Sequence, residues 1–254
     1  MTRSEILSIA KPVLFSTQMV TAVDKGIKKQ TRRVAGDIPQ IESCEKHLFI
    51  RDDFCGGSYT GYVCEKCGFG VSFPHMRYPI GSSFLRPRYD EGDYLYVRET
   101  WCVKNGYPAA LGFDVAYKAS PKILSCMFDS VERYNKFCKF EDKPNWQPAL
   151  FMPKEAARIF LKVTKVRLEP LQDIITGDYM TPVNITREGV YKSCSKCKHF
   201  NGECADFIKD GICDLVKEFR QVWNSTINKK DISIFGWQAN PWVWIYEFEK
   251  VDVD

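Results

Sequence analysis

The chain has 254 residues, of which 44% are hydrophobic and 27% are charged. This length suits one large domain or one domain with insertions, and the composition excludes a disordered chain, a collagen-like repeat and a coiled coil. The formal net charge of +4 is unevenly placed, because residues 1–35 hold seven basic and two acidic side chains. Such a basic patch suits a polyanion or a phosphate-bearing ligand, or it is an ordinary solvated face.

Neither a membrane span nor a secretory leader is expected. The longest uncharged stretch, residues 232–246, has 15 residues and contains Gly236 and Pro241, whereas a span needs about 18 consecutive apolar residues. Glu5 and Lys11 interrupt the apolar residues that follow the first methionine. We therefore expect a cytoplasmic protein.

The first part of the chain predicts short strands and one helix. Residues 12–16 have the pattern of a short buried strand, and Thr17 then supplies a hydroxyl N-cap for a helix that ends at Gly26. Residues 38–83 mix glycines, cysteines and aromatics without a sustained period, which is typical of a small metal-stapled insertion. Residues 89–101 predict a turn followed by an alternating strand.

The middle of the chain predicts two more strands. Residues 111–118 are expected to form the first, and the polar residues 126–145 are interpreted as a loop. A short helical turn over 154–158 leads into residues 159–168, whose β-branched content and alternation predict a long strand.

The last part of the chain predicts two helices and a final strand. A helix is expected to start at Thr186, with Glu188 in its first turn, and a second helix to cover residues 205–223. Residues 242–249 predict the final strand. Short strands separated by isolated helices indicate an α+β fold with a small, mainly antiparallel sheet or barrel.

Cysteine is the most unusual part of the composition, with 11 cysteines beside three histidines. In a reducing compartment, clustered cysteines are more often metal ligands than disulfides. Two C-x-x-C pairs each have further candidate ligands nearby, and four such ligands around one ion make a closed structural zinc site. The first expected site takes Cys64 and Cys67 with Cys44 and either His47 or Cys55, and the second takes Cys194, Cys197, Cys204 and Cys213.

Alternatives remain open for both cysteine groups. His199 would be able to replace a cysteine of the second group, and an iron–sulfur cluster uses the same ligands as zinc. Independent buried cysteines are the other alternative. Neither group has the H-x-E and P-C-x-x-C pattern of a zinc deaminase, so two structural zinc ions are expected and no metal-activated water. The remaining thiols, those of Cys102, Cys126 and Cys138, are interpreted as ordinary buried or unpaired cysteines.

Seven short blocks follow one another in order over most of the chain. They are Lys11-Pro-Val-Leu-Phe-Ser-Thr17, Gly26-Ile-Lys-Lys-Gln-Thr-Arg-Arg33, Gly92-Asp-Tyr-Leu-Tyr-Val-Arg-Glu-Thr-Trp101, Phe151-Met-Pro-Lys-Glu-Ala-Ala-Arg158, Val166-Arg-Leu-Glu-Pro-Leu-Gln-Asp-Ile174, Arg187-Glu-Gly-Val190 and Asn240-Pro-Trp-Val-Trp244. Together they resemble the ASCH family, relatives of PUA domains, and particularly its phage-type members.

The resemblance implies a compact PUA-like β-barrel with flanking helices and a cleft that receives RNA, nucleotides or modified nucleosides. It describes residues 1–254 as a single domain whose core covers about 10–37, 76–190 and 215–254. Residues 38–75 and 191–214, which hold the cysteine groups, are then insertions stapled by zinc. If the protein is phage-encoded, the resemblance also implies that it acts in the cytoplasm of a bacterial host.

Some small ASCH proteins resemble acetylcytidine amidohydrolases, in which a lysine, a threonine three residues later and a distant glutamate form the catalytic set. The matching residues here are Lys28, Thr31 and Glu188. A threonine hydroxyl is a weak nucleophile until a base accepts its proton, and lysine is such a base only when its pKa falls from about 10.4. Glu188 would orient Lys28 or, when protonated, donate a hydrogen bond to the developing oxyanion. The alternatives are a surface lysine, a strand threonine and a glutamate placed by a helix dipole.

Contacts to substrate or nucleic acid are expected from Lys29, Arg32, Arg33, Arg98 and Trp101. The planar guanidinium groups of the arginines present paired N–H donors that suit phosphate oxygens. Alternatively, these arginines form structural ion pairs with carboxylates. Trp101 would stack on a base, a contact that contributes about 1–3 kcal/mol, or it is buried core like the tryptophans of the final strand.

The expected function is therefore binding of nucleic acid or a modified nucleoside, with hydrolysis of an acyl amide on a modified cytidine-type base through Thr31, Lys28 and Glu188. The alternative is a non-catalytic module that binds RNA or a modified base. Nuclease activity is the weakest hypothesis, because the sequence has no histidine pair or carboxylate cluster that would support it.

Overall fold

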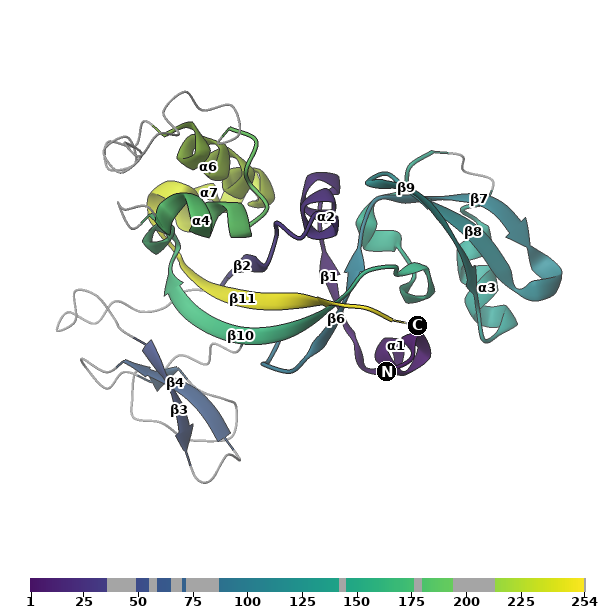
Figure 1. Cartoon of the computed structure of the whole chain (residues 1–254), viewed down its shortest axis with the longest axis horizontal. Coiled ribbons are helices and arrows are strands. Elements are labelled where there is room, and N and C mark those ends of the chain that lie inside the picture. Colours follow the sequence, from purple (N-terminus) through teal and green to yellow (C-terminus); the bar gives the residue numbers. More distant parts are fainter. Residues whose placement is uncertain are drawn as a thin grey trace.

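The computed structural model describes residues 1–35, 49–54, 59–64, 70–71, 87–141, 145–175, 180–193 and 213–253. They form an α+β fold with three sheets, as the sequence predicts at the level of class (Figure 1). Within these ranges no helix is long and apolar enough to cross a membrane.

The main sheet has five strands and carries the candidate site. Their order is β1 (Lys11–Leu14), β6 (Tyr94–Arg98), β10 (Phe160–Pro170), β11 (Trp242–Val251) and β2 (Gln30–Val34). The β1–β6 pair is parallel and the other pairs are antiparallel. The long strands β10 and β11 form the curved centre of this sheet (Figure 1).

A β-bulge in β10 keeps its apolar side chains on one face. The register shifts between Val163 and Lys165, which changes the phase of the alternation by one residue. Leu161 and Val163 before the bulge therefore share the same buried cluster with Val166 and Leu168 after it. The bulge lets one long strand contribute to one core along most of its length.

The two edge strands of the main sheet approach each other without forming a ladder. Among the described strands, β1 and β2 are the ends of the strand order and are not paired with each other. A side chain joins them instead, because Arg33 of β2 donates a hydrogen bond from Nη2 to the carbonyl of Leu14 in β1, at 3.2 Å. We call this junction the seam.

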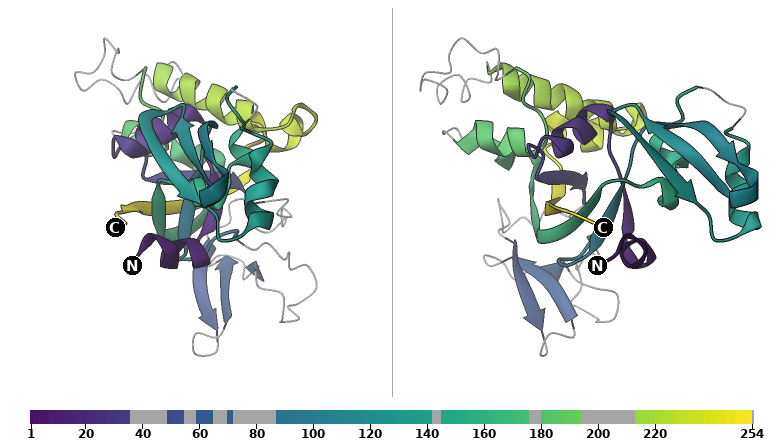
Figure 2. Two further views of the ribbon diagram at one scale, coloured as in Figure 1. Left: turned by 90° about the vertical axis from the view of Figure 1, so that its right-hand side faces the viewer. Right: turned by 45° about the vertical axis from the view of Figure 1, so that its right-hand side comes forward.

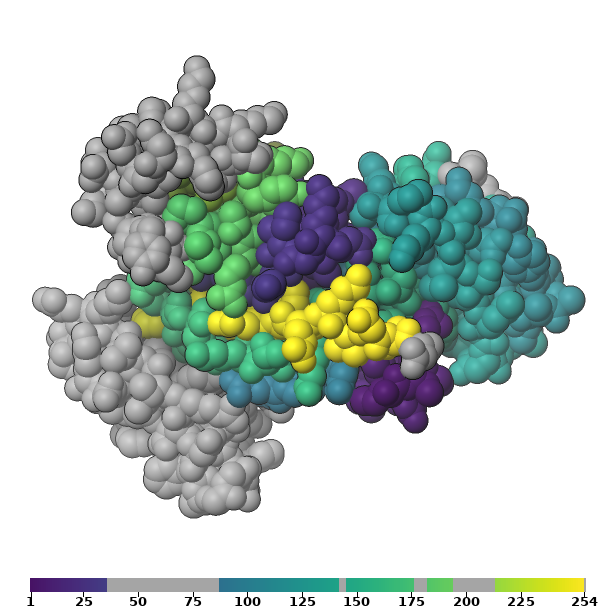
Figure 3. Space-filling view, in the orientation of Figure 1, coloured from purple at the N-terminus to yellow at the C-terminus, as the bar shows by residue number. Residues whose placement is uncertain are grey.

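Helix α2 (Thr17–Asp24) follows β1 and covers the interior of the main sheet. Its N-cap is Ser16, whose hydroxyl accepts from the amide of Met19 at 3.4 Å, so the predicted cap Thr17 is the first helical residue instead. Val20 and Val23 pack into the same core as the sheet. On the face seen in Figure 3, α2 lies between the green chain around α4 and the teal second sheet.

The second sheet contains β7 (Trp101–Tyr107), β8 (Gly112–Tyr117) and β9 (Ser120–Met127), and only β8 is predicted from the sequence. Helix α3 (Val131–Cys138) packs against it and lies inside the stretch that we interpret as a loop. The sheet, α3 and α1 (Arg3–Ile9) enclose a second core (Figure 2). The two termini end close together, beside α1.

A helical layer covers the other face of β11. It contains α4 (Met180–Arg187), α6 (Asp214–Thr226) and the short α7 (Ile232–Phe235). Buried residues of α4 and α6 form a third core with Val243 and Ile245. The buried residues of α6 are spaced as an amphipathic helix requires. The predicted helix over 205–223 is confirmed from Asp214 onward, and residues 205–212 lie outside the described ranges.

The remaining elements are short. The third sheet has β3 (Phe49–Phe54), β4 (Tyr59–Cys64) and β5 (Gly70–Val71), and lies within the predicted insertion 38–75. The 3-10 turns are η1 (Pro108–Ala110), η2 (Ala149–Phe151), η3 (Lys154–Ala156), η4 (Leu171–Ile174), η6 (Lys229–Asp231) and η7 (Trp237–Ala239).

A chain of ion pairs lies where the first and second cores meet. Fully buried Glu99 pairs with Arg158, with 2.8 Å between Oε1 and Nε. Arg158 also pairs with Asp24 at 2.9 Å, and Lys250 lies 3.5 Å from the same carboxylate. Glu99 and Arg158 each have a residue of the first core on one side in the sequence and a residue of the second core on the other. The series of ion pairs therefore joins the first core to the second.

Candidate functional site

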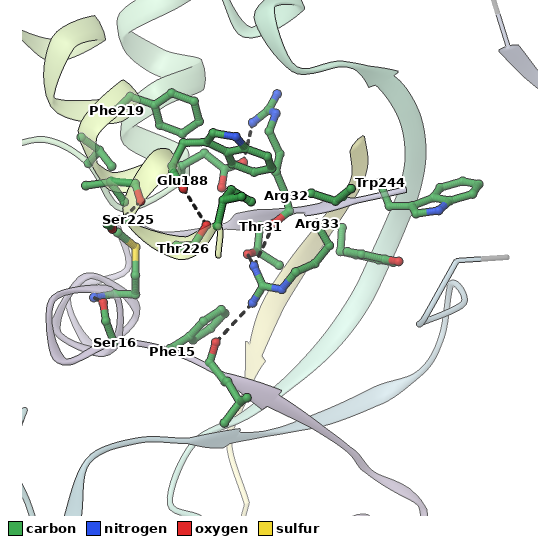
Figure 4. A pocket seen from close by; sticks show the side chains of 18 of the residues that line it. Phe15, Ser16, Thr31, Arg32, Arg33, Glu188, Phe219, Ser225, Thr226 and Trp244 are labelled. Carbon is green, nitrogen blue, oxygen red and sulfur yellow. Dashed lines mark hydrogen bonds and ion pairs between the residues drawn. The ribbon is translucent and has the colours of Figure 1, made fainter. Parts of the chain in front are cut away.

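A pocket of about 600 Å³ opens at the seam, where β2, β11, the start of α2 and the end of α6 meet (Figure 4). β2 is an edge strand, so side chains from both of its faces reach the pocket. The volume lies within the ordinary range for small-molecule sites. The lining residues with polar or aromatic groups include Phe15, Lys28, Thr31, Arg32, Arg33, Arg88, Glu188, Phe219, Trp223, Trp244 and Tyr246.

Lys28 is buried at the base of this pocket, with 4% of its surface exposed. Its ammonium donates to the carbonyls of Gln30 at 2.8 Å and Glu188 at 2.7 Å, and it lies 5.1 Å from the centre of the Phe15 ring. Burial lowers the pKa of Lys28 to about 8; the Glu188 carboxylate opposes this shift, and the charges of Arg33 and Arg32 add to it. A sizeable fraction of Lys28 is therefore neutral at mildly alkaline pH.

Glu188 is also buried, and it is held by two cations. Its carboxylate accepts a hydrogen bond from Arg32 Nη1 and lies 3.7 Å from Lys28 Nζ. Burial acts to raise the pKa of Glu188, but Arg32 and Lys28 together hold that pKa below its ordinary value. The carboxylate is thus ionised, which supports the orienting role and not donation by a protonated acid.

The prediction that a helix starts at Thr186 is wrong, because helix α4 ends at Arg187. Thr186 does not cap a helix: its hydroxyl donates back to the carbonyl of Val183 at 2.9 Å. Gly189 follows with φ of +88°, a left-handed conformation that ends the helix and places Glu188 between α4 and α2. Glu188 therefore lies just after a helix C-terminus, so a helix-dipole explanation for its charge does not apply.

Thr31 and Arg33 lie on one face of β2, opposite Tyr246 and Trp244 of β11. Thr31 Oγ1 accepts a hydrogen bond from Arg33 Nη1 at 2.7 Å, and Arg33 also donates to the carbonyls of Arg32 and Leu14. Figure 4 shows the Arg33 guanidinium between Thr31 and the Phe15 ring, whose centre is 6.0 Å away. The proposed nucleophile is thus in contact with a cation.

Aromatic side chains form two walls of the pocket. Phe219 and Trp223 come from α6, Trp244 and Tyr246 come from β11 opposite Arg33 and Thr31, and Phe15 follows the end of β1. Such walls favour a flat, partly apolar ligand group beside the charged floor.

Three predicted contact residues do not line this pocket. Lys29 is exposed, and its backbone pairs with Arg187 and Phe248. Arg98 lines a separate pocket and donates to the carbonyls of Met152 and Leu150. Trp101 is fully buried in the second core, so the buried-core alternative holds for it.

Sequence reasoning missed Arg88 and Tyr246. The amide of Arg88 donates to the Tyr246 hydroxyl at 2.8 Å, and this contact brings Arg88 to the pocket from a segment far away in sequence. Tyr246 was detectable, since it alternates with Trp244 in the predicted final strand. Arg88 was not, because it lies just before the predicted turn and strand of residues 89–101 and belongs to no pattern itself.

The prediction of two structural zinc ions needs correction. In the part of the chain that the structure describes, no three histidine, cysteine, aspartate or glutamate side chains come together as metal ligands. Cys213 is a free, half-buried cysteine that packs against the third core at the start of α6. Cys64 ends β4, and the other predicted ligands, Cys44, His47, Cys55, Cys67, Cys194, Cys197 and Cys204, lie outside the described residues.

The three other thiols are free, as expected. Cys102 and Cys126 are buried and Cys138 is half-buried. Burial raises the pKa of Cys126 to about 11, so this thiol is not a nucleophile near neutral pH.

The interpretation of the pocket depends on its own residues, because comparisons of the chain with protein-family models, with curated proteins and with solved structures found no match.

Proposed function

We propose that the pocket binds a nucleotide or modified nucleoside and hydrolyses an acyl amide on a cytidine-type base, with Thr31, Lys28 and Glu188 as the catalytic set. The observation that carries the proposal is that these three residues, of which Lys28 and Glu188 are 160 positions apart in the sequence, line one pocket of about 600 Å³. The proposal includes the ASCH assignment, in which the curved main sheet is a PUA-like barrel left open at the seam.

The residues present account for each step of acyl transfer. Neutral Lys28 accepts the hydroxyl proton as Thr31 Oγ1 attacks the acyl carbon, and the electron pair of the carbonyl moves to its oxygen. Arg33, which donates a hydrogen bond to Oγ1, holds the attacking hydroxyl in position. The carbon–nitrogen bond then breaks as Lys28 returns the proton to the amino group of the base, and water hydrolyses the acyl-threonine ester.

One observation favours a non-catalytic binding module as the second candidate. Lys28 Nζ donates to two carbonyls, and the Thr31 hydroxyl contacts Arg33, so the proton transfer requires Lys28 to leave these carbonyls. A module would use the same cations and aromatic walls to hold a base and its sugar without turnover.

The test is to incubate the protein with N4-acetylcytidine and to follow cytidine and acetate by mass spectrometry. Thr31→Val removes the hydroxyl with little change of shape and is expected to abolish turnover. Lys28→Ala is expected to lower kcat by about 10²–10⁴-fold, the usual contribution of a general base. Lys29→Ala is the matched control, because this neighbouring lysine is exposed and outside the pocket.

Turnover that survives both Thr31→Val and Lys28→Ala would remove the catalytic proposal. Absence of turnover by the natural protein, together with salt-dependent RNA binding that weakens in Arg33→Ala, would establish the binding module instead.

A further inference from the structure

The cations of the pocket outnumber its carboxylates. Lys28, Arg32, Arg33 and Arg88 line it, and Glu188 is the single lining carboxylate among the described residues. Glu188 forms ion pairs with Arg32 and Lys28, whereas Arg33 and Arg88 form no ion pair with it.

Arg33 has only neutral partners in the described part of the chain. Its three hydrogen bonds go to the Thr31 hydroxyl and to the carbonyls of Arg32 and Leu14. A guanidinium has five N–H donors, so donors remain for a ligand. Burial lowers the pKa of Arg33, the Glu188 carboxylate opposes this shift, and the charge of Arg88 adds to it. Among the described residues Arg33 forms no ion pair with a carboxylate, so its free donors face the pocket without an anion bound to them.

Arg88 has a fixed backbone and an exposed side chain. Its amide is bonded to Tyr246, and the adjacent Tyr89 packs edge-on against the Tyr246 ring, with 5.1 Å between the ring centres. The Tyr89 hydroxyl in turn donates to the carbonyl of Pro12 in β1, at 2.6 Å. The Arg88 guanidinium lies 5.6 Å from the centre of the Tyr89 ring and forms no ion pair with the described residues. Among the described residues this arginine therefore has no anionic partner, and its position on the pocket leaves it available to a ligand.

Given the proposed function, on which this inference rests, we infer that the substrate carries a phosphate on its ribose and that Arg33 and Arg88 hold this phosphate. Two guanidinium groups facing one pocket from different elements provide planar donor forks that match phosphate oxygens. The aromatic walls hold the base, and the Arg32–Glu188 pair belongs to the catalytic side of the pocket. The preferred substrate is therefore a nucleotide, either free or within a chain, and a free nucleoside is bound more weakly.

The experiment compares dissociation constants for cytidine and cytidine 5′-monophosphate by isothermal titration calorimetry at low and high salt. We expect the natural protein to bind the nucleotide about 10-fold or more tightly than the nucleoside, because charge-assisted hydrogen bonds are roughly twice as strong as neutral ones. In Arg88→Gln and in Arg33→Gln this ratio is expected to fall toward unity. Arg88 is exposed, so its replacement leaves the core intact, and the ratio remains informative even if a variant weakens both probes.

Arg220→Gln is the matched control, since this arginine is on α6 but does not line the pocket, and its ratio should stay at the natural value. A third probe, the dinucleotide ApC, separates the two sources of phosphate: tighter binding of the monophosphate indicates a free nucleotide, and tighter binding of the dinucleotide indicates a polynucleotide.

Equal affinity for cytidine and cytidine 5′-monophosphate, or a ratio that neither Arg33→Gln nor Arg88→Gln changes, would overturn the inference while leaving nucleoside binding intact. Failure to bind any of the probes, with no hydrolysis of N4-acetylcytidine, would overturn the proposed function as well.

Discussion

Lys28 shows how burial of one side chain creates reactivity. Its ammonium is almost removed from water, and two carbonyls and one carboxylate only partly replace the lost hydration. Burial therefore stabilises the neutral amine relative to the charged ammonium, which lowers the pKa of Lys28 to about 8. A lysine that exchanges its proton in this range is able to act as a base, whereas a solvated lysine is not.

The ionisation of Lys28 gives a direct prediction. Glu188→Gln removes the carboxylate that raises the pKa of Lys28, so this pKa is expected to fall below 8. The shift is measured by NMR titration of the Lys28 ε-methylene carbon in protein labelled at lysine. Glu249→Gln is the control, because this exposed carboxylate of β11 lies outside the pocket. A Lys28 midpoint that rises in Glu188→Gln would contradict the electrostatic account.

At the scale of elements, the end of α4 positions Glu188. The chain must leave the helix at Gly189 with a positive φ, and a Cβ there would lie 3.0 Å from Met19 Sδ, 3.1 Å from Ala22 Cβ and 3.2 Å from Lys28 Cδ. The absence of a side chain thus allows α2, Lys28 and the end of α4 to meet.

A residue with a Cβ loses about 1–2 kcal/mol in the left-handed backbone conformation. Gly189→Ala is expected to lower the free energy of unfolding by more than this amount, because the added carbon also crowds its neighbours. Gly26→Ala is a matched control, because Gly26 has φ of +69° with nothing within 4 Å of the added carbon. Urea denaturation measures both changes in the free energy of unfolding. Equal losses in the two variants would show that the contacts around Gly189 do not matter.

Four strands of the main sheet, β1, β6, β10 and β11, were predicted from their apolar patterns, whereas β2 was not, because its consecutive residues Gln30, Thr31 and Arg32 are all buried. In β6, for example, Leu95 and Val97 are buried and Tyr96 is not, which is the alternation that the sequence shows. Helix α3 was not predictable in this way, since Tyr134 is its single buried residue and its sequence reads as polar. The ends of α4 were misplaced because Thr186 has the chemistry of a cap but bonds back into its own helix.

The candidate site was predictable in part. Lys28, Thr31 and Glu188 were identified through the resemblance to acetylcytidine amidohydrolases, and all three line one pocket in the structure. The contribution of Arg88 could not be predicted, because it depends on a hydrogen bond to the distant Tyr246 that no local sequence pattern indicates.

For the whole molecule, the ion-pair chain from Glu99 to Lys250 joins the first two cores. Its inner members are shielded from solvent, with side-chain exposures of 1% for Glu99 and 9% for Arg158. Burial raises the pKa of Glu99, and Arg158 opposes that rise. A pair in this position contributes mainly by preventing an uncompensated buried charge.

Arg158→Met is accordingly expected to reduce the free energy of unfolding by about 3–5 kcal/mol at neutral pH, because Glu99 loses its partner. The loss should shrink as the pH falls: the pKa of Glu99 in the folded chain is above its unfolded value, so protonation stabilises the folded variant. The control Arg167→Met removes two partly exposed pairs, with Glu169 and Glu247, at 30% side-chain exposure of the arginine, and is expected to change stability by about 1 kcal/mol or less. Urea denaturation between pH 5 and pH 8, in roughly unit steps, provides the measurement, and a deficit that grows toward low pH would contradict the role given to Glu99.

The seam between β1 and β2 has a kinetic consequence. In a closed barrel, a ligand that enters between strands must first break a ladder of backbone hydrogen bonds, and that opening limits the rate of association. Here the edges are joined by the half-buried Arg33 side chain, which holds β1 through one hydrogen bond to Leu14 in place of a ladder. Entry at the seam therefore requires a change of rotamer and no unfolding of the sheet, so the speed of binding is governed by diffusion and orientation of the ligand.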